Sequence, residues 1–255
     1  MQSAAGTYRA AMAYPSWPDV MGSAEVGDAV EQARAAVTAL RRHPANRKGW
    51  PRTAAAASIR AARASAALDG APLALDLESE IVTDPTLAGA LRVAAALGSL
   101  ITVWPRAPLQ ALARLHTLAA ADLVPASQLG RPRSTGPAVG MGLARLADLI
   151  TTAPWPAPVQ VALVHGELLT MAPFGDGDGV VARAAARLTM MSTGLDPAGL
   201  GVPEVAHLRS ESRYRDFANG FSIGAENAVV GWIVEVCRCL TVGAREGGSI
   251  SDSAM

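Results

Sequence analysis

The sequence has little lysine and cysteine, few aromatic residues and no net charge. Lys48 is the only lysine among 255 residues, and 22 basic residues balance 22 acidic ones. A chain without net charge offers no broad basic surface, so we expect neither nucleic acid nor an anionic membrane as a partner. The only cysteines, Cys237 and Cys239, lie two positions apart in an expected helix and therefore face different directions. We expect them to be reduced packing residues of a cytoplasmic protein.

Targeting and membrane signals are also missing. The first residues show no signal-peptide pattern. Prolines 154, 156 and 158 interrupt the longest uncharged stretch, from Leu149 to Gly166, so no membrane span is expected. Nothing in the sequence indicates an oligomeric state.

Alternating strand patterns are absent, and apolar residues recur at helical spacing, as at Val161, Val164 and Leu168. We therefore predict an all-α fold with an N-terminal helical extension. Helices are expected over residues 23–42, 53–68, 85–103, 108–121, 137–152, 158–171 and 179–193, with two or three more over 203–244. We divide the chain into an extension with an irregular start and a basic linker (1–52), a helical domain (53–244) and a disordered tail (245–255).

The loop between two of these helices has the features of an anion site. Pro173 ends the preceding helix, and Gly175, Gly177 and Gly179 allow a ligand to approach the backbone. The next helix then begins, with its free N–H groups and its positive dipole end directed at the loop. Arg183 lies one turn into that helix, within reach of an anion held at its start. Gly177, Gly179 and Arg183 are therefore candidates to bind a phosphate or nucleotide.

The same loop is acidic. Asp176 and Asp178 are candidates to hold a hard cation such as Mg²⁺, which prefers carboxylate oxygen and accompanies phosphates. The alternative is a glycine-rich turn that joins two helices, with the aspartates as caps.

The order of residues from Ala172 to Arg183 resembles the signature of the Fic/Doc (Fido) family, His-Pro-Phe-x-Asp-Gly-Asn-Gly-Arg-x-x-Arg. Family members transfer AMP from ATP to a hydroxyl side chain of a target protein. The resemblance implies an all-α Fic-like domain, ATP or another nucleotide with Mg²⁺ as the cofactor, and a protein target as a partner.

Further segments resemble the same family, so the likeness covers about residues 53–244. They are Leu112 to His116, Gly130 with Arg133, Gly140–Thr152, Val202 to Glu204, Tyr214 with Arg215, and Gly231 to Ile233. The region 130–140 is short for the hairpin that docks the target in the family.

Ser65, Asp69 and Gly70 resemble the inhibitory motif of the family, Ser/Thr-x-x-x-Glu-Gly. There a glutamate pairs with the last arginine of the signature and blocks the γ-phosphate of ATP. The resemblance implies that Asp69, which is one methylene shorter, pairs with Arg183. The alternative is a polar residue that closes a helix before Gly70.

Three side chains depart from the signature. Ala172 stands in the position of the catalytic histidine, which acts as a general base, so no catalytic residue is assigned. Asp178 replaces an asparagine, and a carboxylate about 5 Å from a phosphate oxygen repels it by about 3 kcal/mol. Val180 replaces an arginine and removes a charge-assisted hydrogen bond.

No other residue replaces the missing base. His165 lies two helical turns before Ala172, about 10 Å away, and we interpret it and His116 as core histidines satisfied by hydrogen bonds. Ser192 and Thr193 have no paired base, so no hydrolase triad is predicted.

We therefore expect a degenerate Fic-domain protein that binds a nucleotide or phosphate without AMP transfer by the usual mechanism. Two alternatives stay open: an active transferase with altered, metal-assisted chemistry, and a non-catalytic protein-interaction module.

Overall fold

The described part of the chain is built from helices alone. The computed structural model describes residues 17–72, 82–133, 137–152 and 154–253, and none of them forms a strand. This confirms the predicted all-α fold. The helices are α1 (Trp17–Gly22), α2 (Ala24–Arg41), α3 (Asn46–Leu68), α4 (Pro85–Leu100), α5 (Pro108–Ala119), the short 3₁₀ helix η1 (Ala126–Gln128), α6 (Pro137–Thr152), α7 (Ala157–Met171), α8 (Asp178–Ser192), α9 (Pro203–Arg209), α10 (Glu211–Ile223) and α11 (Glu226–Ser253).

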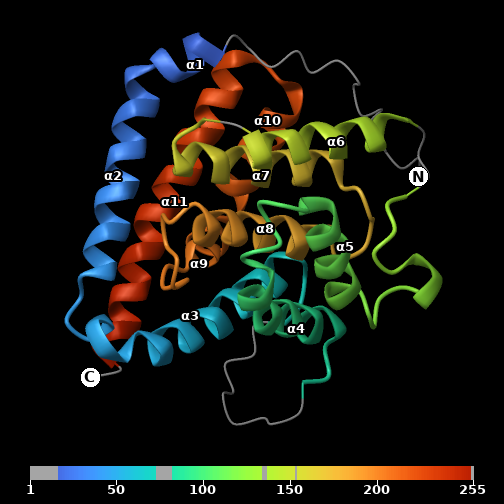
Figure 1. Ribbon diagram of the computed structural model, residues 1–255, viewed down its shortest axis with the longest axis horizontal. Helices are drawn as coiled ribbons and strands as arrows, with labels where there is room; N and C mark the ends of the chain where they lie inside the picture. The colour runs from blue at the N-terminus through green and yellow to red at the C-terminus, as the bar shows by residue number, and fades with distance from the viewer. Residues whose placement is uncertain (1–16, 73–81, 134–136, 153, 254–255) are drawn as a thin grey trace.

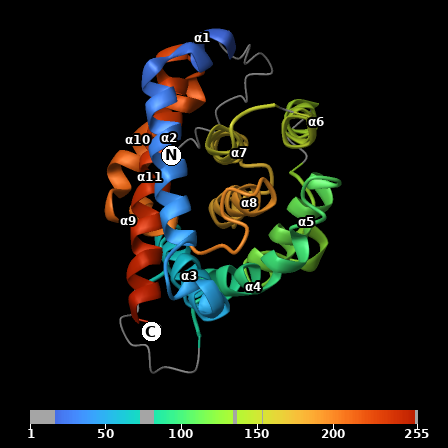
Figure 2. The same ribbon diagram turned by 60° about the vertical axis from the view of Figure 1, so that its left-hand side comes forward.

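Helix α8 runs through the middle of the molecule (Figures 1 and 2). It packs against α7 on one side and against α3, α4 and α5 on the others, and every residue from Val180 to Met190 is buried. Alanine supplies much of this helix, and its small side chain lets neighbouring backbones approach closely. The helices packed around α8 therefore fix the position of the residues at its start.

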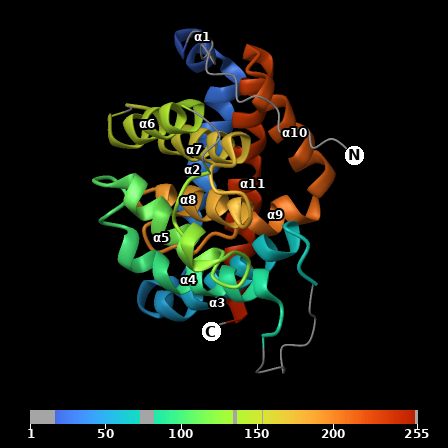
Figure 3. The same ribbon diagram turned by 90° about the vertical axis from the view of Figure 1, so that its right-hand side faces the viewer.

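Two apolar cores lie on either side of α7 and α8. One is formed mainly by α3 to α6 together with α7 and α8, and α6 lies beside α7 in Figures 1 and 3. The other joins α7 and α8 to α2, α10 and α11. Helix α2 lies along α11 (Figure 2) and buries Val30, Val37 and Leu40 in this second core. The N-terminal extension is thus part of the same packed unit as the domain that follows it.

Several helix boundaries differ from the prediction. Residues 17–22 of the expected irregular start form α1, and residues 1–16 lie outside the described part. Helix α3 begins at Asn46 instead of residue 53, so most of the predicted basic linker is helical. Pro51 has no N–H and therefore removes one helical hydrogen bond, the one to the carbonyl of Arg47. Arg47 is an exposed residue, so α3 tolerates this loss. The start of α4 is as predicted, since Asp84 accepts a 2.8 Å hydrogen bond from the Leu87 amide as its N-cap.

The predicted disordered tail is wrong for residues 245–253, which continue α11. Ile250 and Ser251 are buried, and the Asn46 amide donates a 3.0 Å hydrogen bond to the Ser251 hydroxyl. At Gly247 a Cβ would lie 2.4 Å from the carbonyl oxygen of Leu200, so only glycine permits this approach. Because the segment is polar in composition, the sequence does not indicate that it packs against the rest of the protein. Residues 254–255 lie outside the described part.

Helix α11 is a core helix. Among the described residues it alone is long and apolar enough, by length and composition, to cross a membrane, but 56% of its apolar window is buried inside the protein. Cys237 and Cys239, both on α11, are free and buried, as predicted.

Candidate functional site at the start of α8

The loop from Ala172 to Gly177 reverses the chain between α7 and α8 through three left-handed residues. Gly175 (φ 102°) and Gly177 (φ 84°) adopt this conformation without cost. Among the described residues, Ala172 (φ 40°) is the only one other than glycine with a positive φ. Because Pro173 follows it, Ala172 is kept out of the right-handed helical region and α7 ends at Met171. The segment that resembles the signature therefore forms a tight turn, and Ala172 carries a methyl group at its entrance.

Asp178 turns into the loop. Its carboxylate accepts hydrogen bonds from the Phe174 amide at 3.1 Å and from the Gly175 amide at 2.6 Å, and the residue is 8% exposed. Burial raises its pKa to about 6, against the opposing effect of these hydrogen bonds and of nearby Arg133. Two N–H groups of the loop thus donate hydrogen bonds to a carboxylate of the protein itself.

His116 fastens the loop to α5. Its ring stacks on Phe174 with centroids 4.4 Å apart. Its Nδ1 accepts from the Gly130 amide at 2.9 Å, so the proton of the neutral ring lies on Nε2, which donates to the Asp176 carbonyl at 3.1 Å. Burial lowers the pKa of His116 and favours this neutral form. The prediction of a core histidine satisfied by hydrogen bonds is confirmed.

Arg133 closes the other side of the loop. Its amide donates to the Pro173 carbonyl at 2.7 Å, and its guanidinium donates to the Ala172 carbonyl. A Cβ on Gly175 would lie 3.3 Å from Cδ of Arg133. Arg133 is exposed and is a cation beside the loop that the sequence analysis did not assign to the site. Its likeness to the Gly-x-x-Arg turn was the available signal. The region 130–140 was expected to be too short for a docking hairpin. It includes residues 134–136, which lie outside the described part.

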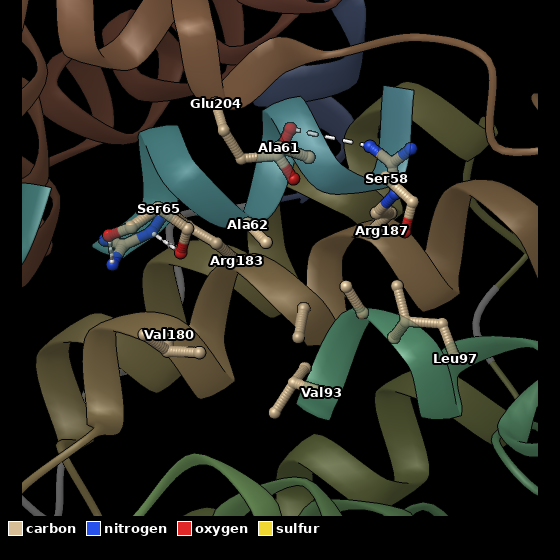
Figure 4. A pocket seen from close by; sticks show the side chains of 12 residues that line it. Ser58, Ala61, Ala62, Ser65, Val93, Leu97, Val180, Arg183, Arg187 and Glu204 are labelled. Atoms are coloured by element: carbon tan, nitrogen blue, oxygen red, sulfur yellow. Dashed lines mark hydrogen bonds and ion pairs between the residues drawn. The ribbon is translucent and has the colours of Figure 1, made fainter. Parts of the chain in front are cut away.

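Arg183 is the only arginine of the signature that the chain retains, and it is 4% exposed. Its Nε donates to the Ser65 hydroxyl at 2.7 Å, and its Nη2 donates to the Ser65 carbonyl at 2.9 Å and to Oδ1 of Asp69 at 2.7 Å. Burial alone lowers its pKa, but Tyr214 and Asp69 raise the pKa of Arg183 above its ordinary value. Figure 4 shows Arg183 directed at Ser65 of α3. The contact between Asp69 and Arg183 that the resemblance implied is present.

Asp69 also lies against the first turn of α8. A Cβ on Gly179 would lie 2.3 Å from Oδ1 and 2.5 Å from Oδ2 of Asp69, so a side chain at Gly179 would collide with this carboxylate. The Asp69 side chain is 24% exposed, and Gly70 continues the chain with φ 94°. A carboxylate of the protein itself therefore lies beside the helix start, at the place where the sequence predicts a phosphate.

The remaining predicted positions are placed differently. Val180, in the position of the first signature arginine, is 3% exposed and packs in the core with Val181 and Leu188. Asp176 is exposed, whereas Asp178 faces the loop amides. Within the described ranges no group of three or more histidine, cysteine, aspartate or glutamate side chains is arranged to hold a metal ion. Metal binding by Asp176 and Asp178 stays a prediction.

The fold is that of Fic domain structures. The chain superposes on a Fic family protein from Desulfovibrio desulfuricans G20 with a TM-score of 0.71 and 20% identity, over 89% of this chain and 75% of that one. It is similar to Fic-1 from C. elegans (TM-score 0.66, 17% identity, 91% and 73% of the two chains). It is also similar to a Fic domain containing signaling protein from Bacteroides thetaiotaomicron VPI-5482 (TM-score 0.65, 13% identity, 88% and 98%). The sequence matches no model of a protein family and no curated protein. These likenesses confirm the predicted Fic fold.

Proposed function

We propose that this Fic-fold protein binds a nucleotide or another phosphate ligand at the start of α8 and does not transfer AMP through a histidine. Without a ligand, the Asp69 carboxylate occupies this binding site. The observation that carries the proposal is the position of the Asp69 carboxylate, which touches Arg183 and the first turn of α8. An anion of the protein itself at this point indicates that the helix start and the guanidinium favour negative charge.

The absence of AMP transfer follows from the side chains at the loop entrance. The methyl group of Ala172 accepts no proton, and general-base catalysis contributes about 10²–10⁴-fold to such reactions. His116 is engaged through both ring nitrogens. The buried apolar side chain of Val180 provides no charge for a second phosphate. Binding is thus the activity that the retained residues support.

Asp69 and a phosphate compete for the same place. Both are anions, and Arg183 is bound on the α3 side by Ser65 and Asp69 together. A ligand must displace the Asp69 carboxylate before it reaches the guanidinium. Removing the charge of Asp69 is therefore expected to increase affinity for phosphates.

Calorimetry with ATP, ADP and AMP, with and without Mg²⁺, tests the proposal on the wild-type protein and on Asp69→Asn. We expect at least tenfold tighter binding for Asp69→Asn, since a competing anion bound to a buried arginine is removed, and no binding for Asp69→Asn combined with Arg183→Ala. Asp122→Asn is a matched control, because Asp122 also forms a 2.7 Å pair with an arginine, Arg92, but on the surface. We expect the wild-type affinity from it.

Absence of heat from Asp69→Asn with every nucleotide, at protein concentrations that detect millimolar binding, would exclude the phosphate ligand. The hypothesis of a non-catalytic interaction module would then be favoured. The other alternative, an active transferase, is tested by incubating the protein with radiolabelled ATP and cell lysate. Transfer of label that is lost in Asp176→Ala would contradict the proposed absence of catalysis.

A further inference from the structure

Two backbone N–H groups of the loop, those of Phe174 and Gly175, are already bound by Asp178. The Asp178 carboxylate accepts from them at 3.1 Å and 2.6 Å, and the residue is 8% exposed. Backbone N–H groups that converge on one point form an anion site. Asp178 lies four and three residues from these two donors, so it competes with a dissolved phosphate at a high effective concentration. The loop part of the site is therefore filled by the protein itself.

The first turn of α8 and Arg183 form the other part of the proposed phosphate site. By helix geometry, the first N–H groups of a helix have no acceptor in the same helix. Gly179 in this turn lies against the Asp69 carboxylate, and Arg183 donates to the same carboxylate at 2.7 Å. A ligand that displaces Asp69 therefore gains one helix start and one guanidinium, which together suffice to bind one phosphate group.

The second arginine of α8, Arg187, is bound elsewhere. It is 4% exposed, and its guanidinium donates to the carbonyls of Gly199 at 2.6 Å and Gly201 at 2.8 Å. It also pairs with Glu204 at 3.5 Å, as Figure 4 shows. Val180 is buried and carries no charge. Of the two arginines of α8, only Arg183 is thus placed to bind a ligand at the helix start.

The loop and the residue that follows it carry two negative charges, those of Asp176 and Asp178. Burial raises the pKa of Asp178 to about 6, which leaves its carboxylate charged at neutral pH. Arg133, whose guanidinium donates to the Ala172 carbonyl, supplies one positive charge beside them. A first phosphate exchanges with Asp69, one anion for another, whereas further phosphates add negative charge next to two aspartates.

We propose that the ligand of this site carries a single phosphate group, as a phosphate monoester does, and that Asp178 excludes a second phosphate by occupying the loop. The inference rests on the proposed function and names the class of ligand within it. One phosphate replaces Asp69 at Arg183 and the start of α8, so its charge is compensated. A di- or triphosphate would have to remove the Asp178 carboxylate from the Phe174 and Gly175 amides or bind beside it.

Calorimetry on Asp69→Asn at about pH 7.5 without Mg²⁺ measures the effect of phosphate number with adenosine, AMP, ADP and ATP. We expect AMP to bind most tightly and adenosine not to bind. ATP should bind at least about tenfold more weakly than AMP, since each charge added within about 10 Å of a carboxylate opposes binding. Ribose 5-phosphate that binds as tightly as AMP would identify a sugar phosphate as sufficient, and weaker binding would identify a mononucleotide. Both results support a ligand with one phosphate.

Asp178→Asn in the same background removes the charge and keeps an oxygen that accepts from a loop amide. We expect ATP to gain about tenfold in affinity relative to AMP. Asp28→Asn is the matched control, because it removes the same charge from an exposed position on α2, and it is expected to keep the preference for AMP. In NMR spectra of Asp69→Asn, we expect AMP to shift the Gly179 amide signal more than that of Gly175.

The outcomes separate this inference from the proposed function. If Asp69→Asn binds none of the three nucleotides, the phosphate site itself is wrong and the inference falls with it. If Asp69→Asn binds ATP as tightly as AMP or more tightly, the site remains and the single-phosphate ligand is excluded. A preference for AMP that persists unchanged in Asp178→Asn would overturn the role of Asp178. Where that variant fails to fold, a larger AMP-induced shift at Gly175 than at Gly179 would overturn this role.

Discussion

Ala172 ends α7 in a left-handed backbone conformation, with φ 40° and ψ 62°. A side chain with a Cβ pays about 1–2 kcal/mol for this conformation, whereas glycine does not. The surrounding contacts keep it there, since its carbonyl accepts from Arg133 and Pro173 follows it. The left-handed turn at Ala172 is thus held in place by its neighbours.

Ala172→Gly is expected to stabilise the protein by about 0.5–1 kcal/mol, because relief of the strained φ exceeds the added entropy of the unfolded chain. Urea unfolding measures the difference. As a control, glycine at the exposed helical position Ala95 of α4 should destabilise by about 1 kcal/mol. A destabilised Ala172→Gly would show that the turn carries no strain.

Asp178 makes stability depend on pH in a direction unusual for a carboxylate. Its pKa is raised by burial from 3.8 to about 6, so between these values the folded state holds a proton that the unfolded state has released. Stability therefore falls as the pH rises through this interval, by about 3 kcal/mol at most. We expect the difference in unfolding free energy between wild type and Asp178→Asn to shift by this amount between pH 4 and pH 7. Parallel pH profiles would contradict the assignment.

The residues of the site were predictable to different degrees. The loop and the pairing of Asp69 with Arg183 followed from the resemblance, because the motif specifies both the turn and its partner. The inward direction of Asp178 did not, since a sequence shows a negative charge but not which amides it meets. Arg133 was not predicted as part of the site for the same reason, because 39 positions separate it from Ala172 and only folding brings its guanidinium to the Ala172 carbonyl.

At the scale of elements, the residue that follows α3, Asp69, lies against the first turn of α8 at Gly179. Asp69 fills the space that a Cβ on Gly179 would need. Gly179 has no positive φ, so its backbone accepts alanine. The close approach of Asp69 to α8 can thus be disturbed without altering a charge.

Gly179→Ala is expected to push Asp69 away from α8, with a loss of about 1–3 kcal/mol from overpacking. Hydrogen exchange should accelerate at residues 65–70 of α3. The loss should shrink in an Asp69→Gly background, where the collision is absent. Gly98→Ala in α4 is the control, since nothing lies within 4 Å of the new methyl group, and helix propensity should stabilise it by about 1 kcal/mol. Equal effects of the two alanines would refute the close approach of Asp69.

For the whole molecule, helix positions were largely predictable and helix ends were not. Apolar periodicity located α2 and α4 to α8 closely. It failed at α3 and at the C-terminal part of α11, where burial depends on contacts between distant segments. Asn46 with Ser251 and Gly247 with Leu200 are such contacts. Polar and small residues give no local sign that they are packed, so sequence reasoning assigned these segments to a linker and a tail.

Deleting residues 245–255 is expected to destabilise the protein by about 3 kcal/mol or more. Ile250 leaves the core, which costs about 1.5–3 kcal/mol, and Asn46 loses its partner at Ser251. Thermal unfolding measures the change against a control that lacks only residues 254–255. An unchanged melting temperature in the longer deletion would restore the interpretation of a disordered tail.

Helix α8 separates two apolar cores and begins at the proposed phosphate site. A ligand bound there depends on a helix that exists only when both cores are assembled, so it binds the native state alone. By mass action such a ligand raises the melting temperature of the entire molecule. A thermal-shift screen of phosphorylated metabolites on the Asp69→Asn protein could therefore find the natural ligand without any assumption about a reaction.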